Sequence, residues 1–133
     1  MKDIQLYISD LSAEYMRKEI GGAKGKEVFF CGYTDGNGVI NNVNVLARGN
    51  EFSVPAVIDF LSPENIVIHN HPSGTLEPSF EDINIASYLG NQGIGVYIVN
   101  NEVSDIYVVV EKYQEEKKNL LEKEKLLKIL EPG

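Results

Sequence analysis

The stretch NIVIHNHPSG, residues 65–74, holds both histidines of a 133-residue chain within one tripeptide. The apolar residues before them continue a strand pattern, and Pro72 ends it. Because side chains alternate across a strand, His69 and His71 project from one face while Asn70 points to the other. The sequence therefore predicts two neighbouring imidazoles at the carboxyl end of a strand, where α/β sheets commonly bind ligands.

A third metal ligand is expected from the helix that follows. The segment PSFED, residues 78–82, is typical of a helix start, with Ser79 as the N-cap and Asp82 at the third helical position. Two neutral imidazoles and one carboxylate match the protein ligands of a catalytic zinc, which keeps a fourth position for water. Solvated histidines and a capping pattern without chemistry would give the same residues. On the residues alone, both explanations stay open.

Composition limits the classes of fold and function. A chain with 43% hydrophobic residues can bury one core, so we expect one compact domain. Cys31 is the sole cysteine, which excludes an internal disulfide and a thiolate zinc cage, so a metal would be bound by His, Asp or Glu. The formal net charge of -8 disfavours direct binding to nucleic acid. No apolar run approaches the roughly 20 residues that span a bilayer, and we expect a cytoplasmic protein with no membrane partner.

Strand and helix patterns alternate along the chain. A DGNG turn joins the first two strand patterns into a hairpin. The alternation predicts an α/β (α+β) domain with a central mixed β-sheet flanked by helices. Helices are expected at residues 9–20, 54–61 and 79–93, and strands at residues 26–34, 39–47, 65–71, 95–100 and 104–111.

The composition changes near residue 111 to Glu, Lys and Leu, with Tyr113, Leu120 and Leu127 seven residues apart. We therefore divide the chain into a domain at residues 1–111 and a charged C-terminal helix or linker at residues 112–133. This helix either packs its leucines on the domain or leads to a further domain or a second copy in a homodimer. The pattern is too short to decide between these alternatives.

The complete motif resembles that of a known family of hydrolases. His69, His71, Ser79 and Asp82 are similar in spacing to the H-x-H-x7-S-x2-D signature of the JAMM (MPN-plus) metallopeptidases, and HNHPSG resembles the RadC branch. The resemblance covers roughly residues 25–111. It implies the three-layer core that JAMM domains share with cytidine deaminases, and a Zn²⁺ bound by His69, His71 and Asp82. It also implies hydrolysis of a peptide or isopeptide bond in a protein substrate.

The same resemblance implies two catalytic residues. Glu27, at the start of the strand pattern at residues 26–34, would be the general base, and Ser79 would stabilise the oxyanion. The assignment of Glu27 requires strand pairing that brings it beside His69, and sequence does not prove register. The alternatives for the base are Glu51, Glu64 and Glu77.

Two other classes of function use a fold of this kind. One is a RadC-like interaction module without catalysis, attached to DNA-repair or helicase machinery. The other is a nucleobase deaminase, which requires H-x-E and P-C-x-x-C. Here the middle residue is Asn70 and only one cysteine exists, so the deaminase is set aside. The segment IVNNEVSDIY, residues 98–107, lacks the Asp-His pair that is usual in RadC proteins, so substrate and DNA-repair partners do not follow from the resemblance.

Overall fold

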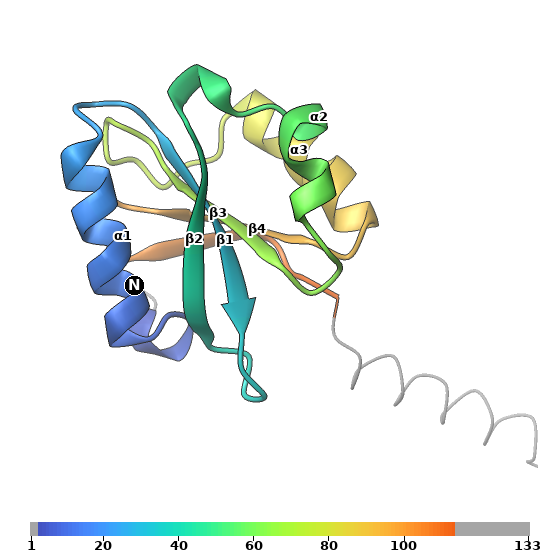
Figure 1. Ribbon diagram of the computed structural model, residues 1–133, viewed down its shortest axis with the longest axis horizontal. Helices are drawn as coiled ribbons and strands as arrows, with labels where there is room; N and C mark the ends of the chain where they lie inside the picture. The colour runs from blue at the N-terminus through green and yellow to red at the C-terminus, as the bar shows by residue number, and fades with distance from the viewer. Residues whose placement is uncertain (1–2, 114–133) are drawn as a thin grey trace, which may run out of the picture.

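A five-stranded mixed sheet forms the middle layer of the domain, as the computed structural model of residues 3–113 shows (Figure 1). The strand order is β2-β1-β3-β4-β5; β3 and β4 are parallel, and all other neighbours are antiparallel. The predicted α+β fold with a central mixed sheet is therefore confirmed. The strands are β1 (Val28–Thr34), β2 (Ile40–Arg48), β3 (Ile66–Asn70), β4 (Gly95–Val99) and β5 (Ile106–Val110).

Helices cover both faces of the sheet. Helix α1 (Asp10–Gly22) lies on one side, and α2 (Val54–Val57) and α3 (Phe80–Asn91) lie on the other (Figure 1). The described residues also contain three short 3-10 turns: η1 (Ile4–Leu6), η2 (Gly49–Glu51) and η3 (Ile58–Phe60). Helices α1 and α3 and the hairpin between β1 and β2 lie where their patterns predict them, whereas the helix expected at residues 54–61 is divided into α2 and η3.

Two separate apolar clusters fill the spaces on either side of the sheet. Phe30 of β1 belongs to the cluster under α1, whereas its neighbour Phe29 belongs to the cluster under α3. On β3, Ile68 and Val67 divide between the clusters in the same way. This is the alternation that a strand buried on both faces requires. His69 has the parity of Val67 and so faces α3 rather than α1.

Helix α3 differs in one respect from its sequence pattern. The spacing of Ile83, Ala86 and Leu89 predicts that all three face the sheet. Ala86 and Leu89 are buried, but Ile83 is 50% exposed, and Asp82 is buried in its place with 6% exposure. Asp82, Ala86 and Leu89 form the i, i+4, i+7 line of the helix that faces the sheet. A carboxylate thus occupies a core position, which the hydrophobic pattern alone does not predict.

The predicted C-terminal helix or linker falls mostly on residues 114–133, which lie outside the described part of the chain. Within residues 3–113, no helix has the length and apolar character needed to cross a membrane. The backbone N–H of Tyr113, the last described residue, donates a 2.9 Å hydrogen bond to the carbonyl oxygen of Gly93. The predicted boundary at residue 111 stays a prediction.

Deletion of residues 114–133 should leave a domain that still unfolds cooperatively. The reason is that the described apolar clusters are built from residues between Ile4 and Val110. Thermal unfolding followed by circular dichroism should show a single sigmoidal transition in the truncated protein, as in the full chain. An insoluble truncation, or one that melts without cooperativity, would mean that the deleted residues complete the core.

Candidate metal centre

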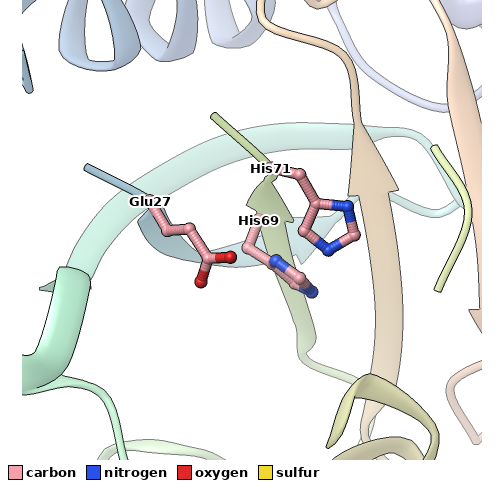
Figure 2. A group of neighbouring side chains, drawn as sticks. All are labelled: Glu27, His69 and His71. Carbon is pink, nitrogen blue, oxygen red and sulfur yellow. The ribbon is translucent and has the colours of Figure 1, made fainter. Parts of the chain in front are cut away.

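The pairing of β1 with β3 brings Glu27 beside both histidines. Phe29 is the partner of His69 in this antiparallel pair. Continued by two residues, the same register sets Glu27 opposite His71. The potential ligand atoms of Glu27, His69 and His71 all lie within 4.8 Å of one another. Figure 2 shows the Glu27 carboxylate turned toward the imidazole of His69.

Helix α3 brings a second carboxylate to the same two imidazoles. Nε2 of His69 lies 3.2 Å from Oδ1 of Asp82, and Nε2 of His71 lies 2.8 Å from Oδ2. Asp82 is also the third residue of a complete capping box. Its backbone N–H donates to Oγ of Ser79 over 3.1 Å, and the N–H of Ser79 donates to Oδ2 of Asp82 over 2.9 Å. The carboxylate is therefore held between the helix start and the histidines.

Asp82 is ionised at neutral pH. Burial on its own would raise the pKa of this carboxyl group. The contacts with His69, the backbone N–H of Ser79 and His71 act in the opposite direction and outweigh burial, so the pKa lies well below its usual range. A negative charge is thus fixed at the convergence point of the two imidazoles.

The hydrogen bonds of His71 define which of its nitrogens can bind a cation. Nδ1 lies 3.1 Å from the carbonyl oxygen of Thr75, which can only accept, so Nδ1 carries the proton. In the neutral ring, Nε2 then presents a lone pair to Oδ2 of Asp82. Two acceptors 2.8 Å apart repel each other unless a cation, either a proton or a metal ion, lies between them. Both Nε2 atoms and the Asp82 carboxylate are therefore arranged around a position for positive charge.

The donor atoms suit a tetrahedral metal, with one spacing shorter than such a site has. With bonds of about 2.0–2.1 Å, two ligand atoms of one zinc ion lie roughly 3.3 Å apart. The contact of His69 with Oδ1 of Asp82, 3.2 Å, is close to that value, whereas the contact of His71 with Oδ2, 2.8 Å, is a hydrogen-bond distance. The donor set of two nitrogens and one oxygen is also the set that zinc accepts in hydrolytic sites.

His69 is oriented by stacking rather than by a second hydrogen bond. Its ring stacks on Phe29 with centroids 4.9 Å apart, and Phe29 stacks on Phe52 at 4.0 Å. Nδ1 of His69 is buried and has no hydrogen-bond partner within the described residues. The aromatic pair thus replaces the polar partner that usually orients a metal-binding histidine.

Two carboxylates compete for the position of third ligand. The group within 4.8 Å consists of Glu27, His69 and His71, whereas the predicted ligands are His69, His71 and Asp82. Asp82 makes direct contact with both Nε2 atoms from a capped, buried position. Glu27 precedes β1 and is half-buried. On this geometry Asp82 fits the ligand position better, and the roles of both residues stay predictions.

An open cleft of about 690 Å³ gives access to the centre. Glu27, Ser79 and Asp82 line it, and so does Glu51, one of the alternatives for the base. Glu64 instead lines a different cleft, and Glu77 lines neither of these two. Oγ of Ser79 accepts the N–H of Asp82, so its own hydroxyl hydrogen remains able to donate toward the cleft. The structure therefore brings all five predicted site residues to one place.

Comparison with known proteins agrees with this arrangement. Residues 7–118 match the family model of the RadC-like JAB domain. The chain belongs to this family. A UPF0758 protein from Clostridioides difficile (strain 630) is 37% identical over 109 residues, an alignment that covers 74% of this chain and 43% of that protein. This RadC-like JAB domain therefore spans less than half the length of that relative. JAB domains form a superfamily with metallohydrolase members.

Two groups that orient the histidines, the ring of Phe29 and the carbonyl of Thr75, are not among the residues predicted from the sequence. Phe29 has the same strand parity as Glu27, so its place on the histidine face follows once β1 is assigned. The contact of His71 with the carbonyl of Thr75 has no sequence signal, because every residue carries that group.

Replacement of Ser79 by Ala should lower the free energy of unfolding by about 1 kcal/mol, because the cap of α3 loses its acceptor. Urea denaturation monitored by circular dichroism measures the change. Ser9→Ala is a matched control, since Ser9 caps α1 through the same kind of bond to the N–H of Ser12. A Ser79→Ala protein as stable as wild type would show that this cap contributes nothing.

Proposed function

We propose that this RadC-like JAB domain is a zinc-dependent metallohydrolase that cleaves a peptide or isopeptide bond of a protein substrate. One observation carries the proposal: two imidazole Nε2 atoms face a buried, ionised carboxylate, and a second carboxylate lies beside them in an open cleft. Such a pairing of a metal position with a free acid-base group suits hydrolysis.

Each residue of the centre would have a separate role in hydrolysis. His69, His71 and Asp82 would hold Zn²⁺, which when bound supplies a water of lowered pKa and polarises a carbonyl group. Glu27 would accept the proton of the attacking water and pass it to the leaving nitrogen. The hydroxyl of Ser79 would donate to the carbonyl oxygen as negative charge develops there.

The surroundings of Glu27 suit a proton carrier. Its side chain is half-buried at the edge of the cleft, and no described hydrogen bond or ion pair holds it. A base that takes and returns a proton needs this freedom, whereas a metal ligand gains from being fixed. Its main chain, by contrast, is fixed by a 2.8 Å hydrogen bond from the N–H of Gly49 to the carbonyl of Glu27.

The purified protein should bind about one Zn²⁺ per chain. Chelators should remove it, and so should acid, because protons compete for the imidazole and carboxylate lone pairs. Elemental analysis after reconstitution and desalting measures the stoichiometry. His71→Ala should fall well below one equivalent. A wild-type protein without stoichiometric metal, or a His71→Ala variant that binds as well, would contradict the assigned site.

Replacement of Glu27 by Gln should separate metal binding from turnover. The amide keeps the size of the side chain but cannot accept a proton, so zinc content and melting temperature should stay near wild type. Hydrolysis should fall by roughly 10²-fold or more. Because the substrate is unassigned, cleavage should be scored by mass spectrometry on a library of peptides and isopeptide-linked peptides.

Glu51→Gln is the matched control, since Glu51 lines the same cleft. It should cleave at the wild-type rate. If Glu51→Gln loses activity and Glu27→Gln does not, the base is Glu51. If wild-type protein binds zinc and cleaves nothing in the library, the non-catalytic interaction module describes the domain better.

A further inference from the structure

The face of β3 opposite the histidines carries a buried polar side chain that the proposed chemistry does not use. Asn70 lies between His69 and His71 in sequence, points toward the α1 side of the sheet and is only 1% exposed. The neighbouring positions on this face, Ile66 and Ile68, are fully buried and apolar. A buried amide in such surroundings is destabilising unless its hydrogen bonds are made.

The Asn70 amide is bonded at both ends. Its Oδ1 accepts the backbone N–H of Val28 over 2.9 Å, and its Nδ2 donates to Oδ1 of Asn101 over 2.8 Å. Nδ2 of Asn101 donates in turn to the carbonyl oxygen of Pro72 over 3.1 Å. The N–H of Val28 can only donate and the carbonyl of Pro72 can only accept, so the direction of the whole series is fixed.

One end of this series lies next to Glu27. Residue pairing between β1 and β3 ends at Phe29 and His69, and the next N–H, that of Val28, bonds to the Asn70 side chain. The other polar group of the same peptide unit, the carbonyl of Glu27, accepts the N–H of Gly49. The peptide unit that follows Glu27 is thus held on both sides.

The other end lies next to His71. Pro72 follows His71 in a turn closed by a 2.8 Å hydrogen bond from the N–H of Gly74 to the carbonyl of His71. Gly74 has a φ of 82°, which glycine adopts without strain. Asn101, from the segment between β4 and β5, connects this turn back to Asn70. Two amide side chains therefore join the segment that carries Glu27 to the segment that carries His71.

We propose that Asn70 and Asn101 are positioning residues, which set the place of Glu27 relative to His71 from the back of the sheet. This rests on the proposed function, because it assigns the two amides to the geometry of the same centre. Asn70 projects from the face opposite the histidines, and Asn101 bonds to it and to the carbonyl of Pro72, so neither is assigned as a ligand or a base. Their effect passes through the main chain at Val28 and Pro72.

The test uses Asn101→Ala, which removes both the acceptor for Asn70 and the donor to Pro72. Cobalt titration of the full chain, followed by visible absorption, reports both affinity and ligand geometry. We expect affinity for Co²⁺ to fall by roughly 10-fold or more, the scale on which supporting hydrogen bonds around a metal site act, because the turn after His71 loses its bond at Pro72. The absorption spectrum of the loaded variant should also differ from that of wild type.

Two further variants separate positioning from general destabilisation. Val43→Ala removes buried apolar atoms from β2 in the α1-side cluster and should lower the melting temperature without changing cobalt affinity or spectrum. Asn101→Asp keeps an acceptor for Asn70 but presents an oxygen to the carbonyl of Pro72, so it should not restore wild-type affinity. The proposal is overturned if Asn101→Ala binds cobalt as Val43→Ala does, or if Asn101→Asp binds as tightly as wild type.

Amide hydrogen exchange on metal-free protein tests the hydrogen bonds between Val28, Asn70 and Asn101 without any bound metal. The N–H of Val28 should exchange at least roughly 10-fold faster in Asn101→Ala than in Val43→Ala. If wild type binds no cobalt, the proposed hydrolase fails, and equal exchange at Val28 in the two variants would then overturn the positioning role as well. If wild type binds no cobalt but Val28 exchanges faster in Asn101→Ala, the hydrolase fails and the positioning of the Glu27 segment by the two amides is supported.

Discussion

The contact of Asp82 with two imidazoles is the constraint on which the rest of the site depends. A buried carboxylate is unfavourable unless it is compensated, and here the compensation comes from one backbone N–H of the helix cap, that of Ser79, and from a cation, proton or metal ion, between the carboxylate and the two histidine nitrogens. The capping box needs α3 to begin at Phe80, and the imidazoles need β3 to end at Asn70. The parallel neighbours β3 and β4 are joined through α3, so the same crossover that builds the sheet delivers the carboxylate to the strand end.

The two faces of β3 carry polar side chains with different roles. One face carries His69, whose ring is set by the stack of Phe29 on Phe52. The other carries Asn70, whose side-chain oxygen accepts the backbone N–H of Val28, just beyond the last paired residues of β1 and β3. An apolar residue at position 70 would match the apolar surroundings on this face of β3. It would, however, leave the N–H of Val28 without its acceptor. A polar residue is therefore needed on the apolar face of β3, because the backbone N–H of Val28 in β1 needs a hydrogen-bond acceptor there.

Local patterns predicted much of this protein, and long-range pairing accounts for what they missed. Alternation within NIVIHNH was enough to place both histidines on one face, and the Ser79 to Asp82 spacing was enough to predict the cap. Hydrophobic spacing put Ile83 in the core, whereas the structure buries Asp82 there, because contacts with histidines from another element outweigh the preference of a carboxylate for water. The position of Glu27 follows from the register of β1 against β3, and the bond from Asn70 to Asn101 joins residues 31 positions apart. Neither register nor such a bond is encoded in a local spacing.

The two carboxylates near the histidines differ in environment, and this difference is what can give them different roles. Asp82 is buried, accepts the backbone N–H of Ser79, lies against both imidazoles and is held at a pKa well below its usual range, so it is negatively charged at neutral pH. Glu27 is half-buried, opens to the cleft and has a fixed main chain, and within residues 3–113 no hydrogen bond or ion pair holds its side chain. A fixed charge suits a ligand, and a movable group suits proton transfer. The separation of roles therefore arises from where the fold places each acid. Asp82 lies inside the cap of α3, whereas Glu27 lies at the solvent-accessible start of β1, where hydrogen bonds from Gly49 and to Asn70 hold the backbone.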